Sequence, residues 1–203
     1  MLPPRAVTEG EVRWDDVLDT AAGFAEDDLR DSDEVRPAMF AFRGEQPLFV
    51  AFVRPFPKGG YADPLIELFA LAGGLRTDRL ALSMPARAWS LDDPIPPVSD
   101  DGDLRQRVLA IELADGWRGG TRTTSILAPF EVLPDRSVRW AERQDMGKGE
   151  GWIGDAVRLT VQQRARLRAP LREVRYQAER CAKLGHELVV APEVAARLLD
   201  ARR

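Results

Sequence analysis

The stretch AMFAFRGEQPLFVAFV, residues 38–53, predicts a β-hairpin. Its two halves are short and rich in aromatic and β-branched residues, and the turn-like sequence GEQP separates them. Outward from this hairpin, alternation of apolar residues predicts further extended segments, with Leu109, Ile111 and Leu113 on one buried face. These segments lie at 79–89, 105–115, 123–133 and 137–143.

Two helices are predicted in the first half of the chain. Residues 8–11 fit a capping box, and the apolar spacing that follows predicts a helix from about Glu9 to Ala22. The acidic stretch 26–35 has a loop-like composition. Asp63 as N-cap and Pro64 at the first helical position predict a second helix, which ends in a left-handed cap at the glycines 73–74.

The strands cluster in the sequence, with one helix between the second strand and the third. This order predicts an α+β fold: a mostly antiparallel sheet of about five to six strands with helices on one face, plus a C-terminal helical segment. We divide the chain into an α+β domain at 1–146 that includes the N-terminal amphipathic helix, a glycine-rich connector at 147–155, and a basic helical tail at 156–203. The tail either stands apart or packs on the same core.

The composition is that of an ordinary folded protein. Of the 203 residues, 44% are hydrophobic and 31% are charged, which argues against wholesale disorder. No run approaches the roughly 18 consecutive apolar residues of a membrane helix, and the N-terminus lacks a secretory pattern. The single cysteine, Cys181, cannot form an intrachain disulfide, so we expect a cytoplasmic protein without a membrane partner.

The connector has a glycine spacing that nucleotide-binding loops share. Gly149, Gly151 and Gly154 match G-x-G-x-x-G, but the motif also needs an acid about 20 residues on, at the end of a parallel strand. The acid in range, Glu173, lies in a helical pattern. We therefore expect a surface connector that binds no cofactor, in which Trp152 either anchors the segment against the sheet or is exposed to a partner.

Residues suited to catalysis or metal binding are few. The only histidine, His186, follows an apparent helix end, and Cys181 falls in an apolar stripe, so both are expected to be structural. Paired carboxylates in loop-like sequence leave a metal-dependent hydrolase as an alternative. These pairs are Asp15-Asp16, Asp27-Asp28, Asp92-Asp93 and Asp100-Asp101 with Asp103. For all of them a solvated surface is the default, with no catalytic residue and no metal site.

The tail combines an apolar seam with many arginines. Apolar residues from Leu167 to Cys181, at steps of four, three, four and three, predict a helix that packs against another helix. Pro170 either kinks this helix or starts a second one, and residues 160–163 fit another capping box. A short strand at 187–192 and a last helix follow.

Charge is polarised between the two ends of the chain. Residues 1–35 hold eleven acids and three arginines, a net charge of −8, while residues 155–203 hold eleven bases and six acids, a net charge of +5. We therefore expect a non-enzymatic interaction module that binds an acidic protein partner, or another copy of itself, through the basic tail. The residues predicted to bind are Arg164, Arg168, Arg172, Arg175 and Trp152.

Other interpretations of the arginine-rich helix stay open. It can bind nucleic-acid phosphates, and the metal-dependent hydrolase is the remaining alternative. The arginines can also pair with the acidic N-terminal helix of the same chain, or simply be solvated.

Overall fold

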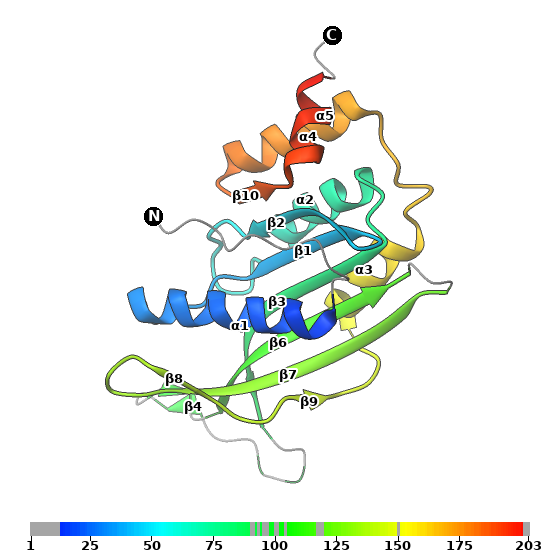
Figure 1. Ribbon diagram of the computed structural model, residues 1–203. Coiled ribbons are helices and arrows are strands. Elements are labelled where there is room, and N and C mark those ends of the chain that lie inside the picture. The colour runs from blue at the N-terminus through cyan, green and yellow to red at the C-terminus, as the bar shows by residue number, and fades with distance from the viewer. Residues whose placement is uncertain are drawn as a thin grey trace.

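The computed structural model describes residues 13–89, 92, 94, 98–99, 102–103, 105–116, 120–149 and 151–200. Within these residues the chain forms five helices and an eight-stranded antiparallel sheet, which confirms the α+β fold with a C-terminal helical segment (Figure 1). The helices are α1 (Trp14–Asp31), α2 (Ala62–Gly74), α3 (Gly151–Gln162), α4 (Leu171–Leu184) and α5 (Pro192–Asp200).

The sheet is built around the predicted hairpin. Its strand order is β10-β2-β1-β3-β6-β7-β8, with β9 also paired to β7, and every described pairing is antiparallel. The strands are β1 (Ala38–Arg43), β2 (Gln46–Phe52), β3 (Arg79–Ala88), β6 (Gln106–Asp115), β7 (Arg122–Val132), β8 (Val138–Trp140), β9 (Gln144–Asp145) and β10 (Glu187–Val190). A separate two-stranded ribbon pairs β4 (Val98–Ser99) with β5 (Gly102–Asp103). Because β10 pairs with β2, the tail contributes the edge strand of the main sheet.

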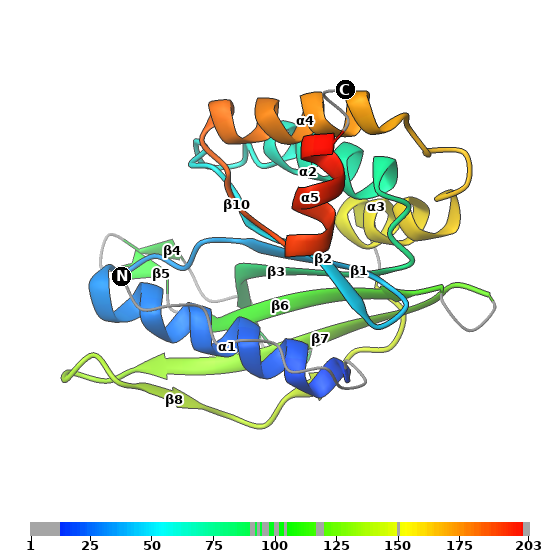
Figure 2. The same cartoon turned by 45° about the horizontal axis from the view of Figure 1, so that its top comes forward.

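Helices cover both faces of the sheet (Figure 2). Alternation along β1 produces this arrangement, since Phe40 and Phe42 pack with α1 while Met39 and Ala41 pack with α2. The expected arrangement with helices over one face holds for α2 and α3, and α1 covers the opposite face. A sheet buried on both sides needs apolar residues at consecutive positions, and β1 has them.

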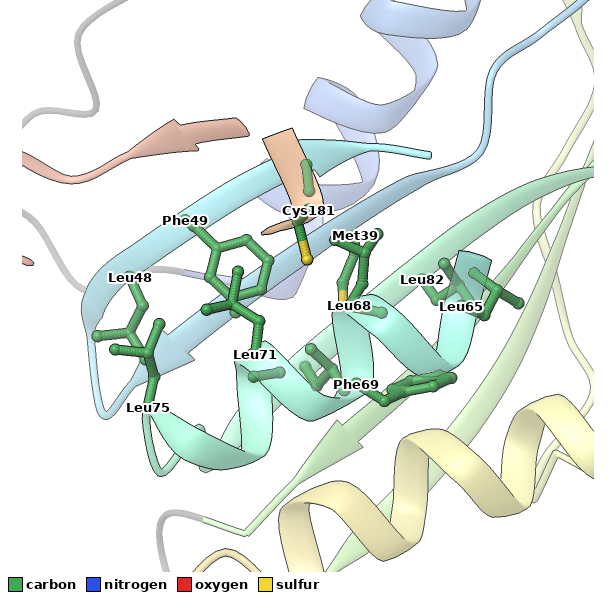
Figure 3. Packing of buried hydrophobic residues seen from close by; sticks show 14 of the residues in the cluster. Met39, Leu48, Phe49, Leu65, Leu68, Phe69, Leu71, Leu75, Leu82 and Cys181 are labelled. Atoms are coloured by element: carbon green, nitrogen blue, oxygen red, sulfur yellow. The ribbon is translucent and has the colours of Figure 1, made fainter. Parts of the chain in front are cut away.

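The tail is part of the core between α2 and the sheet. Val174 and Cys181 of α4 and Leu198 of α5 are buried in the same cluster as the apolar face of α2. Figure 3 shows Cys181 directed from α4 into the space among Met39, Phe49 and Leu68. Two residues of the apolar seam, Val174 and Cys181, therefore pack within the molecule, while Leu167 and Leu171 are exposed.

The helix α1 is longer than the sequence predicted. Residues 23–31, most of them in the stretch expected to be a loop, continue the helix to Asp31. Ala25 and Leu29 extend its apolar stripe and are 1% and 0% exposed. Burial of these two side chains outweighs the weak helix propensity of the aspartates around them. The capping box at 8–11 lies outside the described residues.

The helix boundaries of the tail differ from the sequence prediction in two places, and the structure decides between the two alternatives for Pro170. Thr160 does not start a helix; it lies in the last turn of α3, where its hydroxyl donates to the Ala156 carbonyl at 2.8 Å. Residues 151–155, expected in the connector, form the beginning of α3. The helix α4 begins directly after Pro170, so the proline starts a second helix and does not kink a continuous one.

Candidate functional site

A cavity lies where α2 ends, and we call it the arginine pocket. Its volume is about 540 Å³, within the range of small-molecule sites. Four arginines from four separate segments line it: Arg43 at the end of β1, Arg76 after α2, Arg168 before α4, and Arg197 in α5. The rest of its lining is mostly apolar and comprises Leu48, Gly74, Leu75, Ala169, Pro170, Leu171, Val194 and Leu198.

Positive charge in the arginine pocket is not neutralised by the described residues around it. Among these residues no carboxylate lines the pocket, and Arg76, Arg168 and Arg197 form no ion pair. Arg43 donates a hydrogen bond to the carbonyl of Leu75. Burial lowers the pKa of the Arg43 guanidinium, and the charges of Arg197 and Arg76 lower it further, with Asp78 acting in the opposite direction. The pocket therefore holds several positively charged guanidinium groups close together in a partly desolvated environment.

Arg76 has a strained backbone. Its φ is +59°, a conformation that glycine adopts freely and that costs other residues about 1–2 kcal/mol. The sequence predicted this left-handed cap at the glycines 73–74, but those glycines are needed elsewhere. A Cβ at Gly73 would lie 3.0 Å from Leu167, and one at Gly74 would lie 3.3 Å from Val174. They make room for the α3–α4 connection that carries Arg168, and Arg76 takes the strained position.

The five predicted partner-binding residues lie in different environments. Arg168 lines the arginine pocket. Arg164 is used internally, since its guanidinium donates to the carbonyls of Val161 and Gly116, both at 3.2 Å. Arg175 pairs with Glu179 at 2.8 Å on α4, and Arg172 is exposed in the first turn of that helix.

Trp152 lies at the start of α3 and is 43% exposed. Its ring packs against Tyr61 at a centroid distance of 6.0 Å and against Phe69 at 6.4 Å. It therefore anchors α3 against the start of α2 while one part of the ring stays open to solvent. The same ring lines a second, smaller cavity of about 180 Å³ together with Glu112.

His186 joins the tail to the body of the protein. Its Nδ1 accepts the backbone N–H of Arg54 at 3.1 Å, so a neutral ring carries its proton on Nε2, which lies 2.7 Å from the Glu67 carboxylate. Arg54 makes two hydrogen bonds to the same carboxylate, at 3.0 and 3.2 Å. Burial raises the pKa of the nearby Cys181 thiol to about 11. This arrangement supports the expected structural roles of the histidine and the cysteine.

The carboxylates considered for a metal site are dispersed. No group of three or more His, Cys, Asp or Glu side chains among the described residues is placed to hold a metal ion. Arg105 holds the pKa of the Asp103 carboxyl down at about 2. On α1, Asp27 pairs with Arg30 and Asp28 pairs with Arg36. The acids at 93, 100 and 101 lie outside the described residues.

The acidic helix α1 does not neutralise the basic tail. Its described ion pairs are with arginines outside the tail, such as Arg143, which contacts Asp19 at 2.5 Å. Among the residues described, no helix is long and apolar enough to cross a membrane. Comparison of the chain with protein-family models, with curated proteins and with solved structures gives no match.

The arginine pocket was missed at the level of sequence because its residues are far apart in the chain. Arg43, Arg76 and Arg197 each sit beside apolar residues of an ordinary strand or helix pattern. The one local sign is that an arginine, Arg76, and no glycine, follows the C-cap residue Leu75 of α2.

Proposed function

We propose that this protein is a binding module that captures an acidic segment of a partner protein at the arginine pocket. The observation that carries the proposal is the set of four guanidiniums around one concave, partly apolar space without a carboxylate among its lining residues. Guanidinium groups bind carboxylates with two parallel hydrogen bonds, and they keep their charge when desolvated. An incoming carboxylate would relieve the repulsion between Arg43, Arg76 and Arg197.

The rim of the arginine pocket favours a polypeptide over a small anion. Leu171 lines the pocket and is 39% exposed, and Leu167, which would lie 3.0 Å from a Cβ at Gly73, beside the lining residue Gly74, is 44% exposed. Exposed leucines beside arginines are typical of protein interfaces, whose centres combine apolar contact with a few charged anchors. A free inorganic ion would leave these side chains in water.

Binding of a different protein is favoured over self-association. The acidic helix α1 of a second copy would offer carboxylates to the arginine pocket, but α1 and the pocket lie on opposite faces of the sheet (Figure 2). Copies joined in this way would meet head to tail through two different surfaces, and such contacts extend into open filaments unless they close. A discrete complex with a separate acidic protein avoids this outcome.

A labelled peptide of alternating acidic and leucine residues tests the proposal by fluorescence anisotropy. We expect saturable binding that weakens with added salt, little binding of the same peptide with glutamine in place of its acids, and at least a tenfold loss, about 1.4 kcal/mol, in Arg76→Ala or Arg168→Ala. Arg139→Ala is the matched control, because Arg139 is exposed on β8 and pairs with Glu131.

Three results would change the conclusion. Equal affinity for the acidic and the glutamine peptide would rule out recognition of charge. Displacement of the peptide by low concentrations of inorganic phosphate would indicate a small-anion site. Tight binding of an oligonucleotide, with a steep dependence on salt and on Arg168, would favour nucleic acid as the partner.

A further inference from the structure

The smaller cavity, which we call the aromatic pocket, is lined by a carboxylate and aromatic rings, whereas the arginine pocket is lined by cations. It occupies about 180 Å³ between the start of α2, strands β3 and β6, and the start of α3. Two aromatic rings, those of Tyr61 and Trp152, and one charged residue, Glu112, line it, and its other lining side chains are aliphatic. It lies at the opposite end of α2 from the arginine pocket, about 20 Å away for a helix of this length.

Glu112 is held in place but lacks a full set of partners. Its Oε1 accepts a hydrogen bond from the Ser125 hydroxyl at 2.8 Å. Its Oε2 is buried and has no hydrogen-bond partner among the described residues. The glycine-rich segment covers this oxygen so closely that a Cβ at Gly149 would lie 2.0 Å from it. Burial raises the pKa of the Glu112 carboxyl, the hydrogen bond from Ser125 acts in the opposite direction, and no cation is among the described residues that line the pocket.

The two rings supply surfaces that suit an organic cation. Their centroids lie 6.0 Å apart and their planes meet at 54°, so they present differently oriented faces to a shared space. Cations are attracted to aromatic faces within about 6 Å of the ring centroid, and tryptophan gives the strongest attraction. Trp152 remains 43% exposed, which leaves it accessible from solvent.

We propose that the aromatic pocket binds an alkylammonium group, with Trp152 and Tyr61 contacting the cation and Glu112 supplying the opposite charge. The volume holds about six water-sized groups, comparable to the five heavy atoms of tetramethylammonium. A metal ion would require several oxygen ligands, and Glu112 is the only carboxylate in the described lining. The inference is independent of the proposed function of the arginine pocket.

Titration of the ¹⁵N-labelled protein with tetramethylammonium chloride tests the proposal. The indole N–H signal of Trp152 is identified by its loss in Trp152→Phe. We expect this signal to shift saturably with tetramethylammonium and not with sodium chloride at equal ionic strength or with tert-butanol, the uncharged analogue. Glu112→Gln and Tyr61→Leu should each weaken the binding about tenfold. Glu131→Gln, at an exposed site on β7, should leave it unchanged.

The outcomes separate binding from a general salt or structural effect. Equal responses to tetramethylammonium and to sodium chloride, or to tert-butanol, would overturn the proposal. So would unchanged affinity in both Glu112→Gln and Tyr61→Leu, provided that their melting temperatures show that they are folded. Having two variants from different elements keeps the test decisive if one of them fails to fold.

Discussion

Replacing Arg76 separates the stability of the fold from the function proposed for the arginine pocket. Arg76→Ala and Arg76→Gly both remove the guanidinium, but only glycine adopts φ +59° without strain. The left-handed conformation costs alanine about 1–2 kcal/mol. The greater freedom of glycine in the unfolded chain destabilises the glycine variant by roughly 0.5–1 kcal/mol, which offsets part of this difference. We expect the glycine variant to be more stable than the alanine variant by about 1 kcal/mol.

Urea unfolding and thermal melts measure this difference. For a chain of 203 residues, 1 kcal/mol corresponds to about 2–4 °C in melting temperature. Affinity for the acidic peptide, measured on the same samples, should fall equally in the two variants, because the charge is lost in both. A difference in stability between the alanine and glycine variants, together with equal binding of the peptide, is expected only if Arg76 has a strained backbone and is needed for its side chain.

Arg136 provides a matched control for this experiment. Its φ is +65°, in the turn between β7 and β8, and its guanidinium donates to the carbonyl of Leu29 in α1 at 3.3 Å. Arg136→Gly should again be more stable than Arg136→Ala, and both should bind the peptide normally. An alanine variant at position 76 that is as stable as the glycine variant would refute the assigned strain. Unchanged peptide binding in both would refute the role of Arg76 in the pocket.

Further predictions concern groups in the core. Hydrogen bonds from Arg54 lower the pKa of Glu67. The stabilisation of the fold by these bonds is therefore complete above the ordinary pKa of glutamate and is lost as the pH falls through the lowered pKa. Glu67→Gln should remove this part of the acid dependence of the free energy of unfolding, measured in urea. Cys181 is fully buried and burial raises its pKa to about 11, so a thiol reagent should label the protein at neutral pH only as fast as it unfolds. Gly149→Ala should destabilise the fold, because its methyl would overlap a carboxylate oxygen at 2.0 Å, whereas Gly23→Ala in α1, where a Cβ meets open space, should stabilise it by roughly 0.5–1 kcal/mol in thermal melts.

The sheet could be predicted from the sequence because its signals are local. The hairpin at 38–53 and the strands at 79–89 and 105–115 have alternating or continuous apolar patterns, and they are the centre of the observed sheet. The end of α1 was harder, since its acidic residues obscured the stripe formed by Ala25 and Leu29. Those acids lie on the outer side of a helix whose apolar side is fully buried, so tertiary packing decided the structure there.

The two pockets could not be predicted because each depends on an approach between distant segments. Glu112 alternates with Ile111 and Leu113 along β6, so it lies on the other side of the strand, where α3 and the glycine-rich segment cover it. The glycine spacing that resembled a phosphate loop serves this close approach. Gly149 lies against the Glu112 carboxylate, and a Cβ at Gly154 would lie 3.0 Å from the backbone of Gly149. Close packing and ligand binding demand the same residue type, so the spacing alone does not distinguish them.

In the folded protein, many of the charged residues at the two ends of the chain have internal partners. Acids near the N-terminus are partly neutralised by neighbouring arginines: Asp28 by Arg36, and Asp19 by Arg143. The tail uses Arg164 internally, and Val174 and Cys181 of its seam are buried in the core. What distinguishes the arginine pocket is therefore local geometry and not net charge. If total charge governed binding, removing any exposed arginine would weaken the acidic peptide equally; with the pocket, the loss should be confined to the arginines that line it.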